Sequence, residues 1–168
     1  AFIIEHAEDR YILVDLLVFP LLEKLAAGLP SLKGIIVLTE QAAMPDTALE
    51  NVHCYETLLA GESDTYDWPA LAESDAVAMC YTSGTTGDPK GVVYSHRSQV
   101  LHAYAAVAPD ALNLSNRDTI LPVVPLFHVN AWGIPYAAPM VGAKMVFPGP
   151  KMGDGETLYN LMENEQVT

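Results

Sequence analysis

The amino-acid sequence predicts an α/β fold in which a mainly parallel sheet is covered by helices. Two observations support this class. Short β-prone apolar runs alternate with segments whose apolar residues recur at helical spacing along the 168 residues. Residues 34–38 read G-I-I-V-L, a continuous apolar run typical of a strand that is buried on both faces. Alternation of strands with helices favours parallel strands that are joined by helical crossovers.

Residues 1–60 are interpreted as a βαβ portion. In order, the predicted elements are the end of a helix at residues 1–7, a short strand at 11–14, a helix at 18–27, a buried strand at 34–38, a loop at 41–52 and a helical turn at 55–59. The first full helix carries Leu21, Leu22 and Leu25 on one face. It is predicted to end near Gly28, because glycine and the following Pro30 disfavour its continuation.

Residues 61–74 are acidic and polar, and they are predicted to connect this portion to a second one at residues 75–168. The elements predicted there are strands at 75–81 and 91–94, a helix after Ser95, an extended segment at 119–124, an interrupted helix at 132–140, a strand at 144–147 and a helix at 155–163 that turns Leu158 and Leu161 inward. Ser95 is a typical N-cap residue. The apolar stripe of its helix is predicted as Val100, Tyr104 and Val107, with His102 exposed on the opposite side.

Composition excludes several classes of protein. A formal net charge of −13 argues against a nucleic-acid partner, which would need clustered lysine and arginine. No apolar run approaches the roughly 18–20 residues that span a membrane. Cys54 and Cys80 fit neither a metal motif nor a disulfide framework, so a cytoplasmic protein is expected. The start of the sequence does not resemble a signal peptide. Because the sequence lacks an initiator methionine and breaks off at Thr168 just as an apolar residue appears, we expect an internal piece of a longer protein.

Residues 81–91 carry the most informative motif, Y-T-S-G-T-T-G-D-P-K-G. Gly84 and Gly87 allow backbone amides to turn toward an anion. Hydroxyl donors and a lysine, suited to phosphate oxygens, come from Thr82, Ser83, Thr85, Thr86 and Lys90. The spacing is not that of a Walker A motif, and composition alone would also fit an ordinary surface loop. The motif follows a predicted strand, and ligands of parallel α/β sheets bind beyond the carboxyl ends of strands.

A second motif, P-L-F-H-V-N-A-W-G, occupies residues 125–133. Taken alone, His128 and Trp132 would be interpreted as packed core residues, and the histidines lack ligand-like spacing for a metal. However, T-S-G-T-T-G-x-P-K-G and this second string together closely resemble the signatures of the adenylate-forming superfamily, which contains acyl-CoA synthetases, firefly luciferase and the adenylation domains of peptide synthetases. Residues 4–10 and 94–97 also resemble its fatty-acyl-CoA synthetase branch.

The resemblance implies part of the large N-terminal domain, without the small C-terminal domain. It implies that Lys90 and His128 are catalytic and that Thr82 also reaches Mg²⁺. The implied nucleotide-binding residues are Thr82, Ser83, Gly84, Thr85, Thr86, Gly87 and Lys90. The implied acid-binding residues are His128, Val129, Asn130, Trp132 and Gly133, with Trp132 gating an acyl tunnel.

The implied reaction converts a medium- or long-chain fatty acid to an acyl-adenylate with ATP and then to a thioester with coenzyme A. Two alternatives stay open: an aryl- or amino-acid-activating domain, and a non-catalytic nucleotide-binding module. A homodimer of the complete protein is left open as well. The 168 residues alone are expected to be inactive, because the acidic magnesium-binding segment, the ribose-binding aspartate and the distal catalytic lysine of the superfamily have no counterpart in them.

Overall fold

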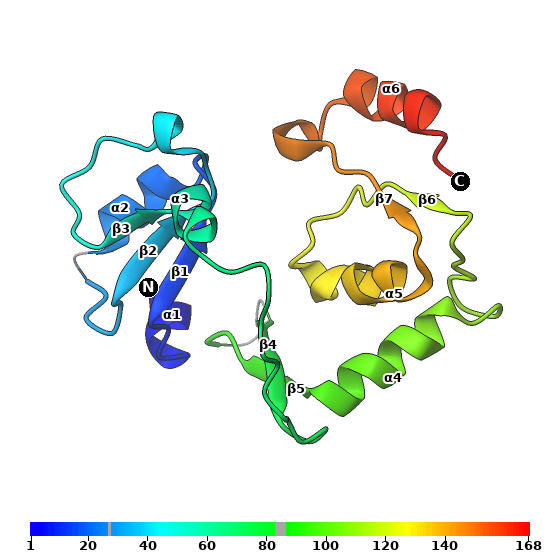
Figure 1. Cartoon of the computed structure of the whole chain (residues 1–168), viewed down its shortest axis with the longest axis horizontal. Helices are drawn as coiled ribbons and strands as arrows, with labels where there is room; N and C mark the ends of the chain where they lie inside the picture. Colours follow the sequence, from blue (N-terminus) through cyan, green and yellow to red (C-terminus); the bar gives the residue numbers. More distant parts are fainter. Residues whose placement is uncertain (27, 83–86) are drawn as a thin grey trace. The chain divides into compact units, whose positions relative to one another are not determined.

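The computed structural model of the chain describes residues 1–26, 28–82 and 87–168 (Figure 1). The chain divides into two compact units, Ala1–Pro69 and Ala70–Thr168. The division falls inside the acidic stretch at residues 61–74. Within the described ranges, no helix is long and apolar enough to cross a membrane.

A three-stranded parallel sheet forms the centre of the first unit. Strands β1 (Tyr11–Val14), β2 (Gly34–Val37) and β3 (Val52–Cys54) lie side by side in that order, with Tyr11 opposite Gly34 and Ile35 opposite Val52. The sequence predicted β1 and β2 but missed β3, which begins where a loop was expected. Its run Val-His-Cys is too short to give a local pattern, so pairing with β2 defines it.

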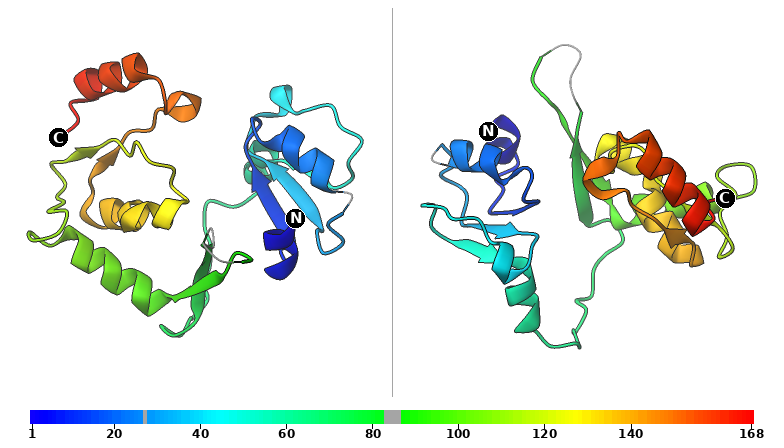
Figure 2. Two further views of the ribbon diagram at one scale, coloured as in Figure 1. Left: turned by 180° about the vertical axis from the view of Figure 1, so that it is seen from behind. Right: turned by 90° about the horizontal axis from the view of Figure 1, so that it is seen from above.

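The core of the first unit lies between this sheet and helix α2 (Phe19–Ala26), which Figure 2 shows beside the strands. Phe19 and Leu22 of α2 are buried against Val14 and Val37, and Val37 is fully buried. Leu21 was predicted on the buried face but is 59% exposed. The shorter elements of this unit are α1 (Phe2–His6), the 3-10 turn η1 (Gln41–Ala43) and α3 (Tyr55–Ala60).

The second unit begins with a β-hairpin. Strands β4 (Ala76–Tyr81) and β5 (Gly91–Ser95) pair antiparallel, with Tyr81 opposite Gly91. Farther on, β6 (Thr119–Ile120) and β7 (Lys144–Met145) pair in parallel. The α/β class is therefore confirmed, but the predicted phosphate motif follows a strand whose partner is antiparallel. The argument from the carboxyl edge of a parallel sheet was wrong for this strand, because β4 pairs with β5 in the antiparallel direction.

Helix α4 (His96–Val107) follows β5 without a break, and Ser95 caps it as predicted. The backbone N–H of Ser98 donates to Ser95 Oγ at 3.1 Å, and the N–H of Ser95 donates to Ser98 Oγ at 3.0 Å. This reciprocal pair fixes the position at which the helix starts.

The apolar stripe predicted for α4 was wrong at two of its positions. Val100 is 51% exposed and Tyr104 is 62% exposed. The buried face instead consists of Ala103 and Ala106, which pack against Ala137 of helix α5 (Ile134–Val141). Small side chains let the two helix backbones approach closely, so the contact depends on the lack of bulk rather than on large apolar residues.

The chain then runs through the 3-10 turn η2 (His128–Gly133) directly into α5, and later through η3 (Gly149–Lys151) into α6 (Gly155–Glu165). Asp154 caps α6, because its carboxylate accepts the N–H of Thr157 at 3.1 Å. Leu158 and Leu161 of this helix are half-buried, in keeping with an inward face. The segment at residues 119–124, predicted to be extended, is a strand only at Thr119–Ile120.

Candidate functional site

The hairpin β4–β5 holds the two ends of the predicted phosphate motif together. The backbone N–H of Thr82 donates to the carbonyl oxygen of Lys90 at 3.0 Å, one step beyond the last paired strand residues. Thr82 and Lys90 are both exposed at the base of the connection. Four residues of the predicted site, Ser83, Gly84, Thr85 and Thr86, lie outside the described residues.

Glycine has a different role at each of two positions of this hairpin. Gly87 has a φ of +114°, which side-chain-bearing residues rarely adopt, and a Cβ there would meet no atom of the described residues within 4 Å. Gly91 begins β5, and a Cβ there would lie 2.7 Å from the Sδ of Met79 on the facing strand. The glycine at 91 therefore leaves room for the side chain of Met79, whereas the glycine at 87 permits a positive φ.

Lys90 carries an exposed ammonium. Among the described residues, the ion pairs are Arg97 with Glu73 and Lys144 with Glu165, so Lys90 has no anionic partner within that part of the chain. An exposed cation that no carboxylate neutralises is suited to receive an anionic ligand.

The second predicted motif lies beside the end of β4. The thiol of Cys80 is 3.9 Å from the carbonyl oxygen of Phe127, which immediately precedes η2. His128 is exposed at the start of η2, and its backbone N–H donates to the carbonyl oxygen of Pro125 at 2.9 Å. Val129 continues the turn in the backbone. The structure thus brings the two motifs, which are some forty residues apart in the sequence, to the same end of one strand.

The backbone of η2 is unusual. Asn130, Ala131 and Trp132 have φ values of 45°, 47° and 55°, and Gly133 continues the run at 79°. Left-handed backbone costs roughly 1–2 kcal/mol for each residue that has a side chain. Such conformations persist only where surrounding contacts determine them, and they gather at ligand sites. Here Ala131 is 1% exposed, so part of the constraint is its burial.

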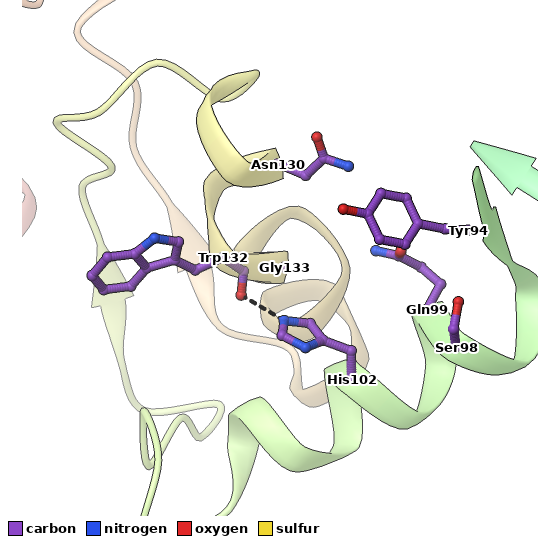
Figure 3. Close-up of a pocket in the computed structure, with 7 residues that line it drawn as sticks. All are labelled: Tyr94, Ser98, Gln99, His102, Asn130, Trp132 and Gly133. Carbon is purple, nitrogen blue, oxygen red and sulfur yellow. Dashed lines mark hydrogen bonds between the residues drawn. The ribbon is translucent and has the colours of Figure 1, made fainter. Parts of the chain in front are cut away.

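A cavity of about 390 Å³ lies between this turn and the adjoining hairpin and helix (Figure 3). Its lining residues are Tyr94 from β5, Ser98, Gln99 and His102 from α4, and Asn130, Trp132 and Gly133 from η2. Asn130 and Tyr94 point toward each other across the cavity. The indole of Trp132 points away from the α4 side chains and is 63% exposed, whereas its backbone carbonyl faces His102.

Three of the predicted site residues, Asn130, Trp132 and Gly133, therefore share one cavity. The residues that β5 and α4 contribute to it were missed. His102 was predicted to be exposed, and it is exposed. Its Nε2 nevertheless lies 3.1 Å from the carbonyl oxygen of Trp132, a contact that the sequence did not indicate. A usable signal existed in the sequence, because Ser98 and His102 lie four residues apart on one helical face directly after the phosphate motif.

Thr82 offers one exposed hydroxyl to a metal ion. Within the described ranges, no group of three or more His, Cys, Asp and Glu residues could hold a metal. A hard divalent cation takes six or more oxygen ligands, so Thr82 fits as one ligand among others that phosphate oxygens, water and further carboxylates would supply.

Several carboxylates of the second unit have a lowered pKa, and their hydrogen bonds have structural roles. The Arg97 guanidinium lowers the pKa of Glu73, and Glu73 in turn raises the pKa of Arg97. Hydrogen bonds from the N–H and hydroxyl of Ser115 lower the pKa of Asp118. The hydroxyl and N–H of Thr157 do the same for the pKa of Asp154. These groups stabilise turns and helix starts, and none of them lines the cavity at η2.

The chain was compared with known proteins. A family model described as "AMP-binding enzyme" matches residues 1–168. The chain is 48% identical over 99% of its length to a medium-chain-fatty-acid–CoA ligase of Ectopseudomonas oleovorans, and covers 30% of that protein. It is 46% identical over its whole length to a long-chain-fatty-acid–CoA ligase of Thermus thermophilus, and covers 29% of it. The chain thus spans about three tenths of the length of these relatives.

Solved structures agree on the fold. An anthranilate CoA ligase in complex with anthranoyl-AMP superposes with a TM-score of 0.78 at 24% identity, over 99% of this chain and 31% of that one. A luciferase-like enzyme of the mealworm Zophobas morio gives a TM-score of 0.78 at 20% identity, over 99% of this chain and 36% of that one. The fold is that of the N-terminal domains of adenylate-forming enzymes. The chain belongs to the AMP-binding enzyme family.

Proposed function

We propose that this chain is the part of an acyl-CoA synthetase that holds the triphosphate of ATP and begins the acid-binding pocket. In the first step, a carboxylate oxygen of the acid attacks the α-phosphorus of ATP. The bond to pyrophosphate breaks, which leaves an acyl-adenylate. In the second step, the sulfur of coenzyme A attacks the acyl carbon and forms the thioester as AMP leaves.

The observation that carries this proposal is the adjacency of the two motifs. The Cys80 thiol approaches the Phe127 carbonyl at 3.9 Å, so the end of β4 and the start of η2 lie together. Adenylation needs the triphosphate and the carboxylate to be held at neighbouring points, because positioning supplies much of the rate enhancement of such reactions. A loop for one reactant and a turn for the other meet that requirement.

On the phosphate side, Lys90 supplies a point charge to the β- and γ-phosphates, and Thr82 lies across the hairpin from it. The hydroxyls and glycines of residues 83–87 complete this role in the proposal. A bound Mg²⁺, with Thr82 among its ligands, would neutralise phosphate charge as pyrophosphate leaves. The negative charge that develops on the leaving group explains why a fixed cation at position 90 would favour the transition state.

On the acid side, His128 is proposed to stand beside the reacting carboxylate, with Val129, Asn130, Trp132 and Gly133 lining the path of the acyl chain. Fatty acids are the substrate class that we favour, because relatives at 46% and 48% identity are named as ligases of long- and medium-chain fatty acids. A relative at 42% identity is named 3-methylmercaptopropionyl-CoA ligase, so a short sulfur-containing acid is the specific competitor. A cytoplasmic location is part of the same proposal.

The proposal is tested by ATP–pyrophosphate exchange in the complete protein that carries this chain. The panel contains octanoate, palmitate, 3-(methylthio)propanoate, anthranilate and phenylalanine. Exchange that is fastest with octanoate or palmitate is expected. Exchange that is fastest with anthranilate or phenylalanine would overturn the substrate class. Absence of exchange with every acid, despite binding of ATP, would identify a non-catalytic nucleotide-binding module.

A further inference from the structure

His102 contacts one peptide unit of η2 at two points. Its Nε2 lies 3.1 Å from the carbonyl oxygen of Trp132. Because a carbonyl oxygen only accepts, Nε2 carries the proton of this hydrogen bond. The same ring packs on the next residue, where a Cβ at Gly133 would lie 2.5 Å from Cδ2 of His102. The imidazole therefore fills the space next to the peptide between Trp132 and Gly133.

That peptide lies at the end of the left-handed run. Trp132 has a φ of 55° and Gly133 a φ of 79°, so the contacts of η2 must offset unfavourable backbone conformations. The carbonyl of Trp132 points to His102 while its indole leaves on the other side (Figure 3). A contact that holds this carbonyl therefore also fixes the direction in which the indole leaves the backbone.

We propose that His102 is a positioning residue for Trp132. The inference rests on the proposed function, in which the indole of Trp132 limits the length of the acyl chain. His102 acts through the Trp132 carbonyl and determines where the indole stands, so the acyl-length preference depends on a side chain of α4 outside the second motif. For this positioning role, residue 102 must carry an N–H donor as far from its Cβ as the Nε2 of imidazole is.

Two substitutions separate the hydrogen bond from the presence of a polar side chain. His102→Gln places an amide N–H at the same number of bonds from Cβ as the imidazole Nε2, whereas His102→Asn is one atom too short. We expect Gln to keep the acyl-length profile of the wild type. We expect Asn to change the ratio of kcat/KM between the preferred acid and one several carbons longer by about two- to tenfold, the range for one lost hydrogen bond. Equal profiles for both variants would overturn the proposal.

A double substitution tests whether His102 acts through Trp132. In a Trp132→Ala background, His102→Asn should change the acyl-length profile no further, because the indole that it positions is gone. If His102→Asn changes the acyl-length profile as much in that background as in the wild type, His102 contacts the acid directly. That result would refute the inference. Tyr104→Ala, at a 62% exposed position on the same helix, is the matched control and should leave the profile unchanged. The KM for ATP should stay constant in all these variants.

A measurement without catalysis keeps this inference separate from the proposed function. Hydroxyl-radical footprinting with peptide mass spectrometry reports the oxidation rate of Trp132 in the complete protein. His102→Asn should change this rate by at least about twofold and His102→Gln should not, while Trp68, 86% exposed in the first unit, serves as internal reference. An altered Trp132 footprint with no ligase activity in the wild type would refute the proposed function and keep the positioning contact. An unaltered footprint in every variant would refute the contact itself.

Discussion

The hairpin β4–β5 and the turn η2 support the two halves of the candidate site in contrasting ways. The hairpin uses ordinary antiparallel pairing up to Tyr81 and Gly91, and its polar residues lie beyond the paired strands. The turn instead places its own residues in left-handed backbone and relies on contacts from another element, His102 of α4. Side chains at the hairpin should therefore be replaceable with local effects on chemistry, whereas changes at the turn should also affect the fold.

The largest expected effect tests the chemical half of this comparison. Lys90→Ala should slow acyl-adenylate formation by roughly 10- to 150-fold, the equivalent of about 1.5–3 kcal/mol for hydrogen bonds to a charged group. Thioester formation from preformed acyl-adenylate should suffer less, because the triphosphate has already left. Rapid-quench assays of the two half-reactions measure both rates.

The control for this change is Lys144→Ala, which removes an exposed lysine paired with Glu165. It should leave both half-reactions near the wild-type rates. Loss of equal size in both half-reactions of Lys90→Ala would contradict a role on the leaving phosphates. If Lys90→Ala unfolds the protein, this would contradict the expectation that side chains of the hairpin can be replaced without affecting the fold.

The structural half of the comparison is tested by Gly133→Ala. The added methyl combines a φ of +79° with an approach of 2.5 Å to His102, so we expect a loss of about 1–3 kcal/mol in the free energy of unfolding. Denaturant titration of the complete protein measures it. In a His102→Ala background the clash is removed but the strain remains, so the loss should be smaller.

Two other glycines separate the components of that loss. Gly149 has a φ of +57° with open space around it, and Gly153 has open space and no positive φ. Gly149→Ala should therefore report strain alone, and Gly153→Ala should be neutral. A cost at Gly133 no greater than the cost at Gly149 would mean that the ring of His102 yields easily, and would weaken the contrast with the hairpin.

A smaller effect is expected when the indole itself is removed. Trp132→Ala should shift the preferred acid toward a different length, because each buried methylene is worth about 0.8 kcal/mol, or roughly fourfold in kcat/KM. The KM for ATP should change little. An unchanged length profile together with weaker ATP binding would move Trp132 from the acid side of the site to the nucleotide side.

The smallest effect concerns the turn at Ser115 and Asp118, which belongs to neither region and does not line the cavity. Bonds from Ser115 lower the pKa of Asp118 below its ordinary value of 3.8, so the charged form stabilises the folded state above that pH. This contribution is lost as the pH falls through the lowered pKa. Asp118→Asn should lower Tm slightly near pH 7, and the difference from the wild type should disappear in acid. Asp64→Asn, in the exposed acidic stretch, is the control; a difference that persists in acid would contradict the sign.

The sequence predicted the α/β class, most elements and the two strands β4 and β5, because glycine, proline and β-prone runs act locally. It did not predict that these two strands pair antiparallel. It could not predict β3, whose three residues become a strand only by pairing with β2. It also misjudged α4, since Tyr104 looked like a core residue while the helix packs through alanines. The local sequence pattern indicates which residues are hydrophobic, but it does not indicate which other element will pack against them.

The residues of the candidate site also fall into those that the sequence predicted and those that it missed. Asn130, Trp132 and Gly133 were predicted from a family string, and they share one cavity. His102 was missed because its role depends on the backbone direction of a turn thirty positions away in the sequence. The spacing of Ser98 and His102 on α4 could indicate a polar face of the helix. It could not indicate that this face contacts the carbonyl oxygen of Trp132.

The alanine contact between α4 and α5 has a consequence for how such a pocket can change over time. Ala106 and Ala137 hold α5 close to α4, and α5 continues without interruption from η2. One added methyl group at this contact would push α5 outward and carry the adjoining turn with it. Under the proposed function, substitutions at Ala106 or Ala137 would therefore change which acids are accepted, although neither residue lines the cavity.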